Sequence, residues 1–195
     1  WLGHYLKWLR TSPQGVTERR ARNNHGTCYD LQVASIAAYL GDLSLVQSTL
    51  QASWQRMLDQ FSPDGRQPHE LDRTLTAHYC CFSLQCWVNL GTLARECGED
   101  LWDFTGSDGR GLRVVFEWLL PYFMTNAEWP FPQDEPCDRD RILPLYFAYR
   151  DHYGTEGALA EIDNRYNVKP IFFPHDGIKP FWMLGAGFLL GDDEH

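Results

Sequence analysis

The chain has 195 residues, of which 44% are hydrophobic and 14% aromatic, and this composition is typical of one domain with a sizeable core. Its net charge of −9 argues against a general nucleic-acid binder. No stretch approaches the ~20 apolar residues that are needed to span a bilayer. No targeting signal is visible, and the first residue is Trp1 rather than Met, so the sequence says little about the compartment.

Apolar residues at spacings of three and four predict helices along most of the chain. The predicted helices cover residues 1–13, 30–40, 43–61, 70–97, 112–123, 139–153 and 155–165. We expect the fifth to stop near Pro121. Segments rich in Pro, Gly and Asp are expected to be irregular, and these are residues 62–68, 105–111, 128–136 and 168–182. Because no strand alternation or internal repeat is visible, the sequence predicts antiparallel helix pairs without a second domain.

The cysteines and histidines show no metal-binding pattern. The six cysteines, whose spacing fits no zinc framework, are Cys28, Cys80, Cys81, Cys86, Cys97 and Cys137. We expect most of them to be small buried residues on helices, and a disulfide that includes Cys137 stays open. The seven histidines are scattered. We therefore predict neither a metal site nor a cofactor.

Two polar clusters are candidates for a site. Asn23, Asn24 and His25 stand at an expected helix start, where asparagine is a favoured cap. Arg73 and Tyr79 lie six positions apart, about 600° of helical rotation, so they share a site only if a loop precedes the helix. Taken singly, each residue has an ordinary structural explanation: His25 as a capping group, Tyr79 as a core ring and Arg73 as a surface charge.

A basic run precedes the first cluster. Arg19, Arg20 and Arg22 either attract a polyanion or form a solvated basic turn, and the residues alone leave both interpretations open.

Two longer strings carry a family resemblance. "NNHGTCYDLQVASIAAYLGD", followed by "SPDGRQPHELDRTLTAHYCCFSLQ", resembles the alginate lyase domain shared by polysaccharide lyase families 5 and 38. The resemblance covers roughly residues 5–135 and includes "DLWDFTGSDGRGLRVVFEWLLPY". It implies an all-α fold, an (α/α) toroid or incomplete helical barrel with a groove across it. Because the family carries a further helical region before these motifs, we expect 1–195 to be a single domain, the C-terminal portion of such a toroid.

The resemblance also implies a reaction. Members of the family cleave uronic-acid polymers such as alginate or glucuronan by β-elimination. Asn24 and Arg73 match the residues that hold the uronate carboxylate. Tyr79 matches the tyrosine that protonates the leaving oxygen and also removes the proton when both lie on one side of the ring. His25 would neutralise the carboxylate or act as the base from the opposite face.

Four further residues are expected to bind substrate or support the site: Asn23, Gln67, Glu70 and His78. The family's usual Trp is replaced by Cys28, which alters a subsite or is repacked.

The resemblance implies an anionic polysaccharide as the partner rather than nucleic acid or a membrane, and a secreted or periplasmic location. It leaves the oligomeric state open. Two other functions compete with a lyase: a truncated, non-catalytic carbohydrate-binding homologue, and a helical interaction module in which the motifs are structural remnants.

Overall fold

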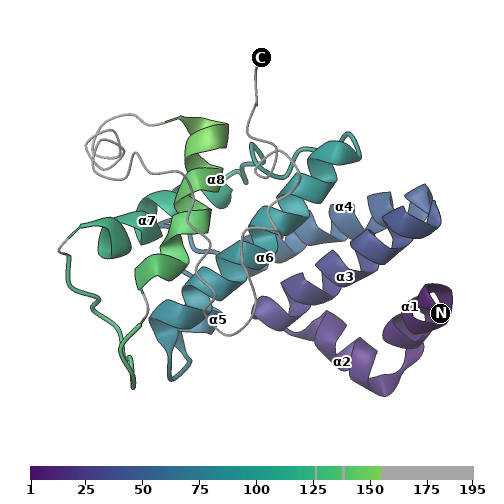
Figure 1. Cartoon of the computed structure of the whole chain (residues 1–195), viewed down its shortest axis with the longest axis horizontal. Helices are drawn as coiled ribbons and strands as arrows, with labels where there is room; N and C mark the ends of the chain where they lie inside the picture. The colour runs from purple at the N-terminus through teal and green to yellow at the C-terminus, as the bar shows by residue number, and fades with distance from the viewer. Residues whose placement is uncertain (126, 138, 155–195) are drawn as a thin grey trace, which may run out of the picture.

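The computed structural model describes residues 1–125, 127–137 and 139–154, and this part of the chain is built of helices (Figure 1). The elements are α1 (Leu2–Thr11), α2 (Pro13–Arg20), α3 (Asn24–Leu40), α4 (Leu43–Gln60), α5 (Pro68–Leu71), α6 (Thr76–Glu96), α7 (Leu112–Met124), the 3-10 helix η1 (Arg139–Ile142) and α8 (Leu143–Tyr153). Within the described ranges, the β-type pairing is one isolated bridge between Leu75 and Gln133.

The N-terminal third differs from the prediction at two places. The predicted helix over 1–13 ends at Thr11, and a second helix, α2, follows at Pro13–Arg20, where no helix is predicted beyond residue 13. It starts where the Ser12 side chain accepts a hydrogen bond from the Gly15 amide. Helix α3 begins at Asn24 rather than near Asp30. The Asn23 side chain caps α3 by accepting a hydrogen bond from the His25 backbone amide, so the polar cluster stands at a helix start, as expected.

The predicted helix over 70–97 is wrong as a single element, because it is divided into α5 and α6 by a turn at residues 72–75. The new helix is held at its start by Gln133, whose side-chain oxygen accepts from the Ala77 amide at 2.9 Å. Arg73 therefore lies in a turn while Tyr79 lies on α6, which is the arrangement that a shared site requires.

The predicted helix over 112–123 is present as α7, which runs through Pro121 and ends at Met124. Proline costs the helix one hydrogen bond, but the residues beyond it, Phe123 and Met124, are buried in the core and hold the last turn in place. The predicted helix over 155–165 and the extended segment 168–182 lie outside the described residues.

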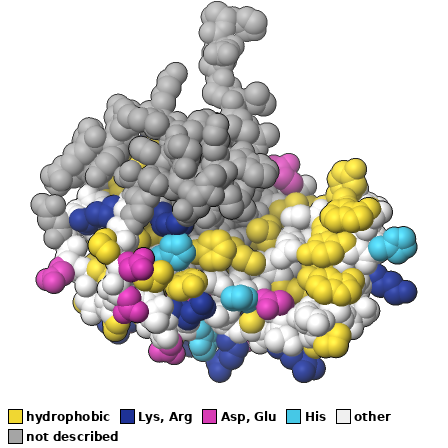
Figure 2. Space-filling model, turned by 60° about the horizontal axis from the view of Figure 1, so that its bottom comes forward, with side chains coloured by type: hydrophobic (Ala, Val, Ile, Leu, Met, Phe, Trp, Pro, Cys, Tyr) yellow, Lys and Arg dark blue, Asp and Glu magenta, His cyan; other side chains and the backbone are white. Residues whose placement is uncertain are grey.

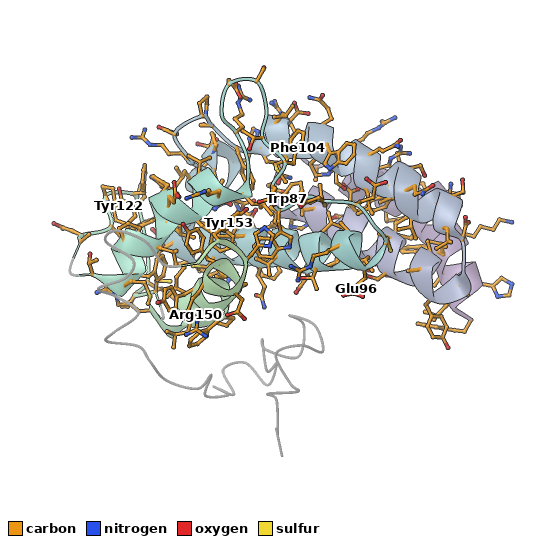
Figure 3. The ribbon with its side chains drawn as sticks, turned by 90° about the horizontal axis from the view of Figure 1, so that it is seen from above. Trp87, Glu96, Phe104, Tyr122, Arg150 and Tyr153 are labelled. Carbon is orange, nitrogen blue, oxygen red and sulfur yellow. A yellow bond between two sulfur atoms is a disulfide. The ribbon has the colours of Figure 1, made fainter. Side chains whose placement is uncertain are left out.

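The main core lies where α3 and α4, joined by a tight turn at Gly41, pack against α6. Trp87 of α6 is fully buried at its centre, and its ring packs against Phe61 (Figure 3). A smaller apolar cluster joins α1 to α3. Helices α1 and α2 thus lie at one end of the molecule, and α7 and α8 at the other (Figure 1). Within the described part, no helix is long and apolar enough to cross a membrane.

Candidate active site

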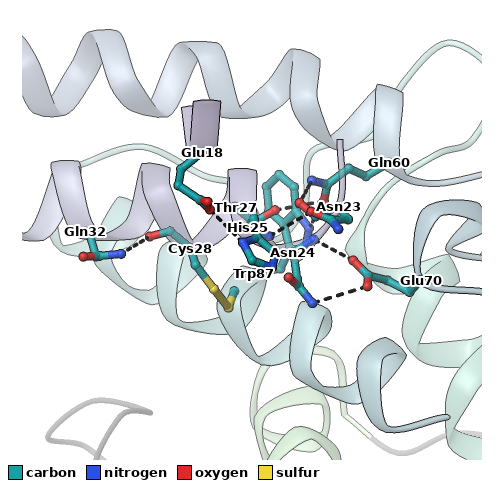
Figure 4. Close-up of a disulfide and its surroundings, with 11 residues drawn as sticks. Glu18, Asn23, Asn24, His25, Thr27, Cys28, Gln32, Gln60, Glu70 and Trp87 are labelled. Atoms are coloured by element: carbon teal, nitrogen blue, oxygen red, sulfur yellow. Dashed lines mark hydrogen bonds and ion pairs between the residues drawn. A yellow bond between two sulfur atoms is a disulfide. The ribbon is translucent and has the colours of Figure 1, made fainter. Parts of the chain in front are cut away.

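Glu70 of α5 connects the two sequence motifs. Its carboxylate accepts the Asn24 backbone N–H at 2.6 Å and the Asn24 side-chain amide at 3.3 Å (Figure 4). Burial raises the pKa of Glu70 to about 7. The hydrogen bond from the Asn24 backbone and the nearby Arg73 and His25 act to lower this pKa, but their effect is smaller. Glu70 therefore fixes the Asn24 side chain and also lies within electrostatic reach of both motifs.

Helix α4 holds the chain that leads into α3. The Arg56 guanidinium pairs with Asp30 at 2.6 Å and donates to the backbone carbonyls of Arg19 and Ala21. One turn later, the Gln60 side chain donates to the carbonyl of Asn23 at 2.8 Å. These bonds fix the backbone on which Asn24 and His25 stand.

The glycine after His25 is required by close packing. A Cβ at Gly26 would lie 2.2 Å from a guanidinium nitrogen of Arg56 and 2.3 Å from the Ala21 carbonyl oxygen. Any side chain at this position would displace the Arg56 guanidinium or the backbone beside it. Because Gly26 has no side chain, Arg56 of α4 can pack against it and donate to the Ala21 carbonyl.

His25 projects toward solvent and is paired with a residue that the sequence analysis did not identify. Its Nδ1 lies 2.7 Å from Oε2 of Glu18 on α2, and the two side chains are 50% and 46% exposed. An acceptor on Nδ1 favours the tautomer that carries a proton there, which leaves Nε2 to accept a proton from a ligand. Glu18 also stabilises the imidazolium that would then form.

The second motif brings a cation to the face of a tyrosine. The Arg73 guanidinium carbon lies 3.9 Å above the centroid of the Tyr79 ring, close enough for a cation–π contact. The His78 ring meets Tyr79 edge-on at 5.2 Å and stacks on Phe82 one turn later. Arg73, Tyr79 and His78 are all half-buried, so each presents part of its side chain to solvent.

Two of the expected substrate-binding residues are buried inside the protein. Gln67 and Glu70 are 1% and 2% exposed. The Gln67 side-chain amide donates to the carbonyl of Cys80 at 3.1 Å, which ties the turn before α5 to α6. The hydrogen bonds that both side chains make in this structure are to other residues of the protein.

A disulfide joins Cys28 of α3 to Cys86 of α6 (Figure 4). Cys28 lies three residues after His25, and Cys86 lies two helical turns after Tyr79. Cys28 thus provides a covalent link between α3 and α6, the two helices that carry the candidate residues Asn24, His25 and Tyr79. Cys137 takes no part in this bond.

A pocket of about 370 Å³ opens beside the first motif. Asn24, His25 and Glu18 line one side, and aromatic residues of α1 together with Phe82 line much of the rest. Its wall does not include Arg73 or Tyr79. The structure therefore brings the first motif into a pocket and connects it to the second motif through Glu70. No group of three or more His, Cys, Asp or Glu within the described ranges could hold a metal ion.

Comparisons with known proteins agree with this architecture. The chain matches the family model described as "Alginate lyase" over residues 1–129. It is also similar to the crystal structure of an alginate lyase from Bacteroides ovatus, with 29% sequence identity and a TM-score of 0.78. That match covers 85% of this chain and 44% of the other, so the chain spans less than half the length of the solved lyase. No curated protein matches it.

These matches confirm the family resemblance and the all-α fold of the (α/α) toroid class. The family match covers most of the chain and includes every candidate residue of both motifs. The chain belongs to the alginate lyase family.

Proposed function

We propose that the protein is a polysaccharide lyase that cleaves a uronic-acid polymer, alginate or glucuronan, by β-elimination. The observation that carries the proposal is the arrangement of the two motifs around Glu70, which binds Asn24 directly and lies near both His25 and Arg73. Cleavage by elimination needs a carboxylate neutraliser, a base and an acid at one sugar, and the two motifs contain residues of each kind.

β-Elimination at a uronate requires two proton transfers and stabilisation of negative charge on the carboxylate. A base removes the proton at C5, the electron pair forms the C4–C5 double bond, and the C4–O bond breaks as the leaving oxygen takes up a proton. The C5 proton is only weakly acidic because it lies next to a carboxylate, which must accept further negative charge as the proton leaves. Hydrogen-bond donors that meet this carboxylate lower the barrier.

Asn24 and Arg73 are the proposed donors. An amide nitrogen carries two hydrogens, and the bond to Glu70 uses one of those on Asn24, so the other remains for the substrate carboxylate. Tyr79 is the proposed acid that protonates the leaving oxygen. The guanidinium above its ring stabilises the negative charge that Tyr79 then holds.

His25 is the proposed base when the C5 proton and the leaving oxygen lie on opposite faces of the sugar. Its contact with Glu18 supports this role, because a carboxylate on Nδ1 orients the ring and stabilises the imidazolium. When both groups lie on the same face, Tyr79 removes the proton as well, and His25 helps to neutralise the carboxylate. The stereochemistry of the polymer selects between these routes.

The remaining candidate residues support this site. Glu70 orients Asn24, Gln67 holds α5 on α6, and Asn23 caps α3. His78 packs edge-on against Tyr79 and restricts the orientation of its ring. We propose no direct sugar contact for Gln67 or Glu70.

The proposed partner is an anionic polysaccharide outside the cytoplasm. Disulfides persist in oxidising compartments, and the Cys28–Cys86 bond is consistent with a secreted or periplasmic protein.

The test is the release of unsaturated uronate from alginate and from glucuronan, followed by its ultraviolet absorbance. The Tyr79→Phe variant keeps the ring and the contact with Arg73 but lacks the proton to donate, so we expect no measurable turnover. Tyr39→Phe is the matched control, because Tyr39 is exposed on α3 and lies outside the pocket. Binding of oligouronates without any product from the wild-type protein, or full turnover by Tyr79→Phe, would contradict the proposal.

A further inference from the structure

The pocket next to His25 has a wall of aromatic rings that the proposed reaction does not use. Tyr5 and Trp8 contribute this wall from α1, and Phe82 lies in the lining from α6. Trp8 is 48% exposed and Phe82 is 40% exposed, so both rings present part of their surface to solvent. Figure 2 shows hydrophobic side chains gathered on the right of this face, where the N-terminal helices lie.

The rings on α1 form an ordered array. The Tyr5 ring lies between Trp1 and Trp8, with centroids 5.8 Å away on each side and interplanar angles of 8° and 17°. The Tyr5 hydroxyl donates to the Gln32 side chain at 3.0 Å, and Gln32 in turn donates to the carbonyl of Cys28. The wall is therefore tied to the helix that carries His25 and needs little ordering when a ligand binds.

Positive charge lies beside the same pocket. Tyr29 lines it. Burial raises the pKa of this tyrosine and the Asp30 carboxylate acts in the same direction, while the guanidinium groups of Arg19 and Arg10 act to lower it. Both arginines are exposed and so are able to meet an anion. An exposed apolar wall with cations at its margin suits a ligand that is flat and apolar on one side and negatively charged at its edge.

We propose that Tyr5, Trp8 and Phe82 form a subsite for the uronate ring next to the one that reacts at His25. A pyranose ring presents a face of C–H groups that packs on an aromatic ring, while its carboxylate projects from the edge. The pocket volume of about 370 Å³ falls within the usual range for small-molecule sites, about 300–1,000 Å³. The inference deepens the proposed lyase function and rests on it for the identity of the sugar.

Two observations favour a sugar over a second copy of the chain. The pocket is continuous with Asn24 and His25, which a protein partner would cover. The second observation is that two exposed arginines, Arg10 and Arg19, act on Tyr29 in the pocket lining and offer cations to a uronate carboxylate, while the Glu18 carboxylate in the same lining is paired with His25.

The experiment measures the affinity for saturated trimers of mannuronate, guluronate and glucuronate by calorimetry, and the KM for the polymers by ultraviolet absorbance. Trp8→Ala removes one half-exposed ring and should leave the fold intact, which circular dichroism will check. We expect about a tenfold weaker affinity and a similar rise in KM, with kcat within twofold. Tyr39→Ala is the matched control, because it removes an exposed ring that does not line the pocket.

The outcomes separate the subsite from the reaction. If the wild-type protein cleaves a polyuronate and Trp8→Ala keeps its affinity and KM, the subsite is wrong while the lyase function stands. If the trimers bind with Trp8-dependent affinity and no polymer is cleaved, the subsite stands and the function fails. Absence of both binding and cleavage overturns both proposals. Loss of a dimer in Trp8→Ala, with unchanged trimer affinity, assigns the wall to a second copy and overturns the subsite.

Discussion

The carboxylate of Glu70 accepts two hydrogen bonds from Asn24, one from its backbone at 2.6 Å and one from its side chain at 3.3 Å. Both residues are buried, although the proposed reaction requires Asn24 to meet a sugar at the pocket wall. A buried carboxylate of this kind does not bind substrate itself. It holds a neutral donor rigidly at the wall, which is how a preorganised site avoids rearrangement during the reaction.

Glu70 makes the stability of the protein depend on pH in an unusual direction. Burial raises the pKa of its carboxyl from the ordinary 4.5 to about 7, so the folded protein retains the proton over a range in which the unfolded chain loses it. Its contribution to stability is present in full below pH 4.5 and is lost as the pH rises through about 7. We therefore expect Glu70→Gln to flatten the pH dependence of the unfolding free energy in this range.

Chemical denaturation at a series of pH values measures this dependence. Glu96→Gln is the control, because Glu96 is an exposed carboxylate at the end of α6 and should leave the curve unchanged. A Glu70→Gln curve parallel to that of the wild type would show that another group sets the slope.

The pairing of Glu18 with His25 leads to a kinetic prediction. Glu18→Gln keeps the size of the side chain and an acceptor for Nδ1, but removes the charge that stabilises the imidazolium. We expect kcat to fall at least about tenfold while KM stays within twofold, because the interaction matters only once His25 has taken a proton. Steady-state kinetics with alginate and with glucuronan measure both constants.

The control for this variant is Glu117→Gln, which removes a carboxylate of similar exposure that pairs with Arg113 on the surface of α7. It should leave both kinetic constants unchanged. A rise in KM with kcat unchanged for Glu18→Gln would instead assign Glu18 to substrate binding.

The sequence predicted most helices correctly, and its errors have local causes. Helix α2 has no clear apolar stripe, so periodicity did not reveal it, and Glu18 was missed along with it. The signal was nevertheless present, since Ser12 followed by Pro13 is a typical helix start. The break between α5 and α6 depends on Gln133, a residue far away in the sequence, and no local pattern could have predicted it.

The candidate site was likewise predicted from the sequence only in part. Asn24, His25, Arg73 and Tyr79 were identified because two motifs with suitable spacing resemble those of a known family. The disulfide between Cys28 and Cys86 was not predicted, because its partners meet only when α3 packs on α6. The burial of Glu70 likewise follows from tertiary packing and changes its proposed role from contact to support.

The ion pair between Arg56 and Asp30 should dominate the stability of the chain around the first motif. The side chains are only 14% and 4% exposed, so removal of the cation leaves an unpaired buried carboxylate. We expect Arg56→Met to cost about 3–5 kcal/mol of unfolding free energy in urea titrations. Arg66→Met, which removes an exposed partner of Asp64, should cost less than about 1 kcal/mol.

The double variant Arg56→Met/Asp30→Asn separates the charge from the backbone contacts. It should recover part of the loss, because no charge remains buried, but not all of it, because the carbonyls of Arg19 and Ala21 have lost their donor. Arg56→Met with wild-type stability would mean that water replaces the guanidinium without cost.

The disulfide is expected to stabilise the site region mainly through the unfolded chain. Cys28 and Cys86 are 58 residues apart, and closure of a loop of this length is worth about 4 kcal/mol in the chain-entropy description. We expect Cys28→Ala/Cys86→Ala to lower the unfolding free energy by roughly that amount and to make it insensitive to reducing agent. Cys97→Ala, at the end of α6, is the control. Its unfolding free energy should still fall when reducing agent is added, because the Cys28–Cys86 bond is intact in this variant. Equal stability of the wild-type protein with and without reductant would show that the covalent link between α3 and α6 is dispensable, and that packing alone holds the two motifs in place.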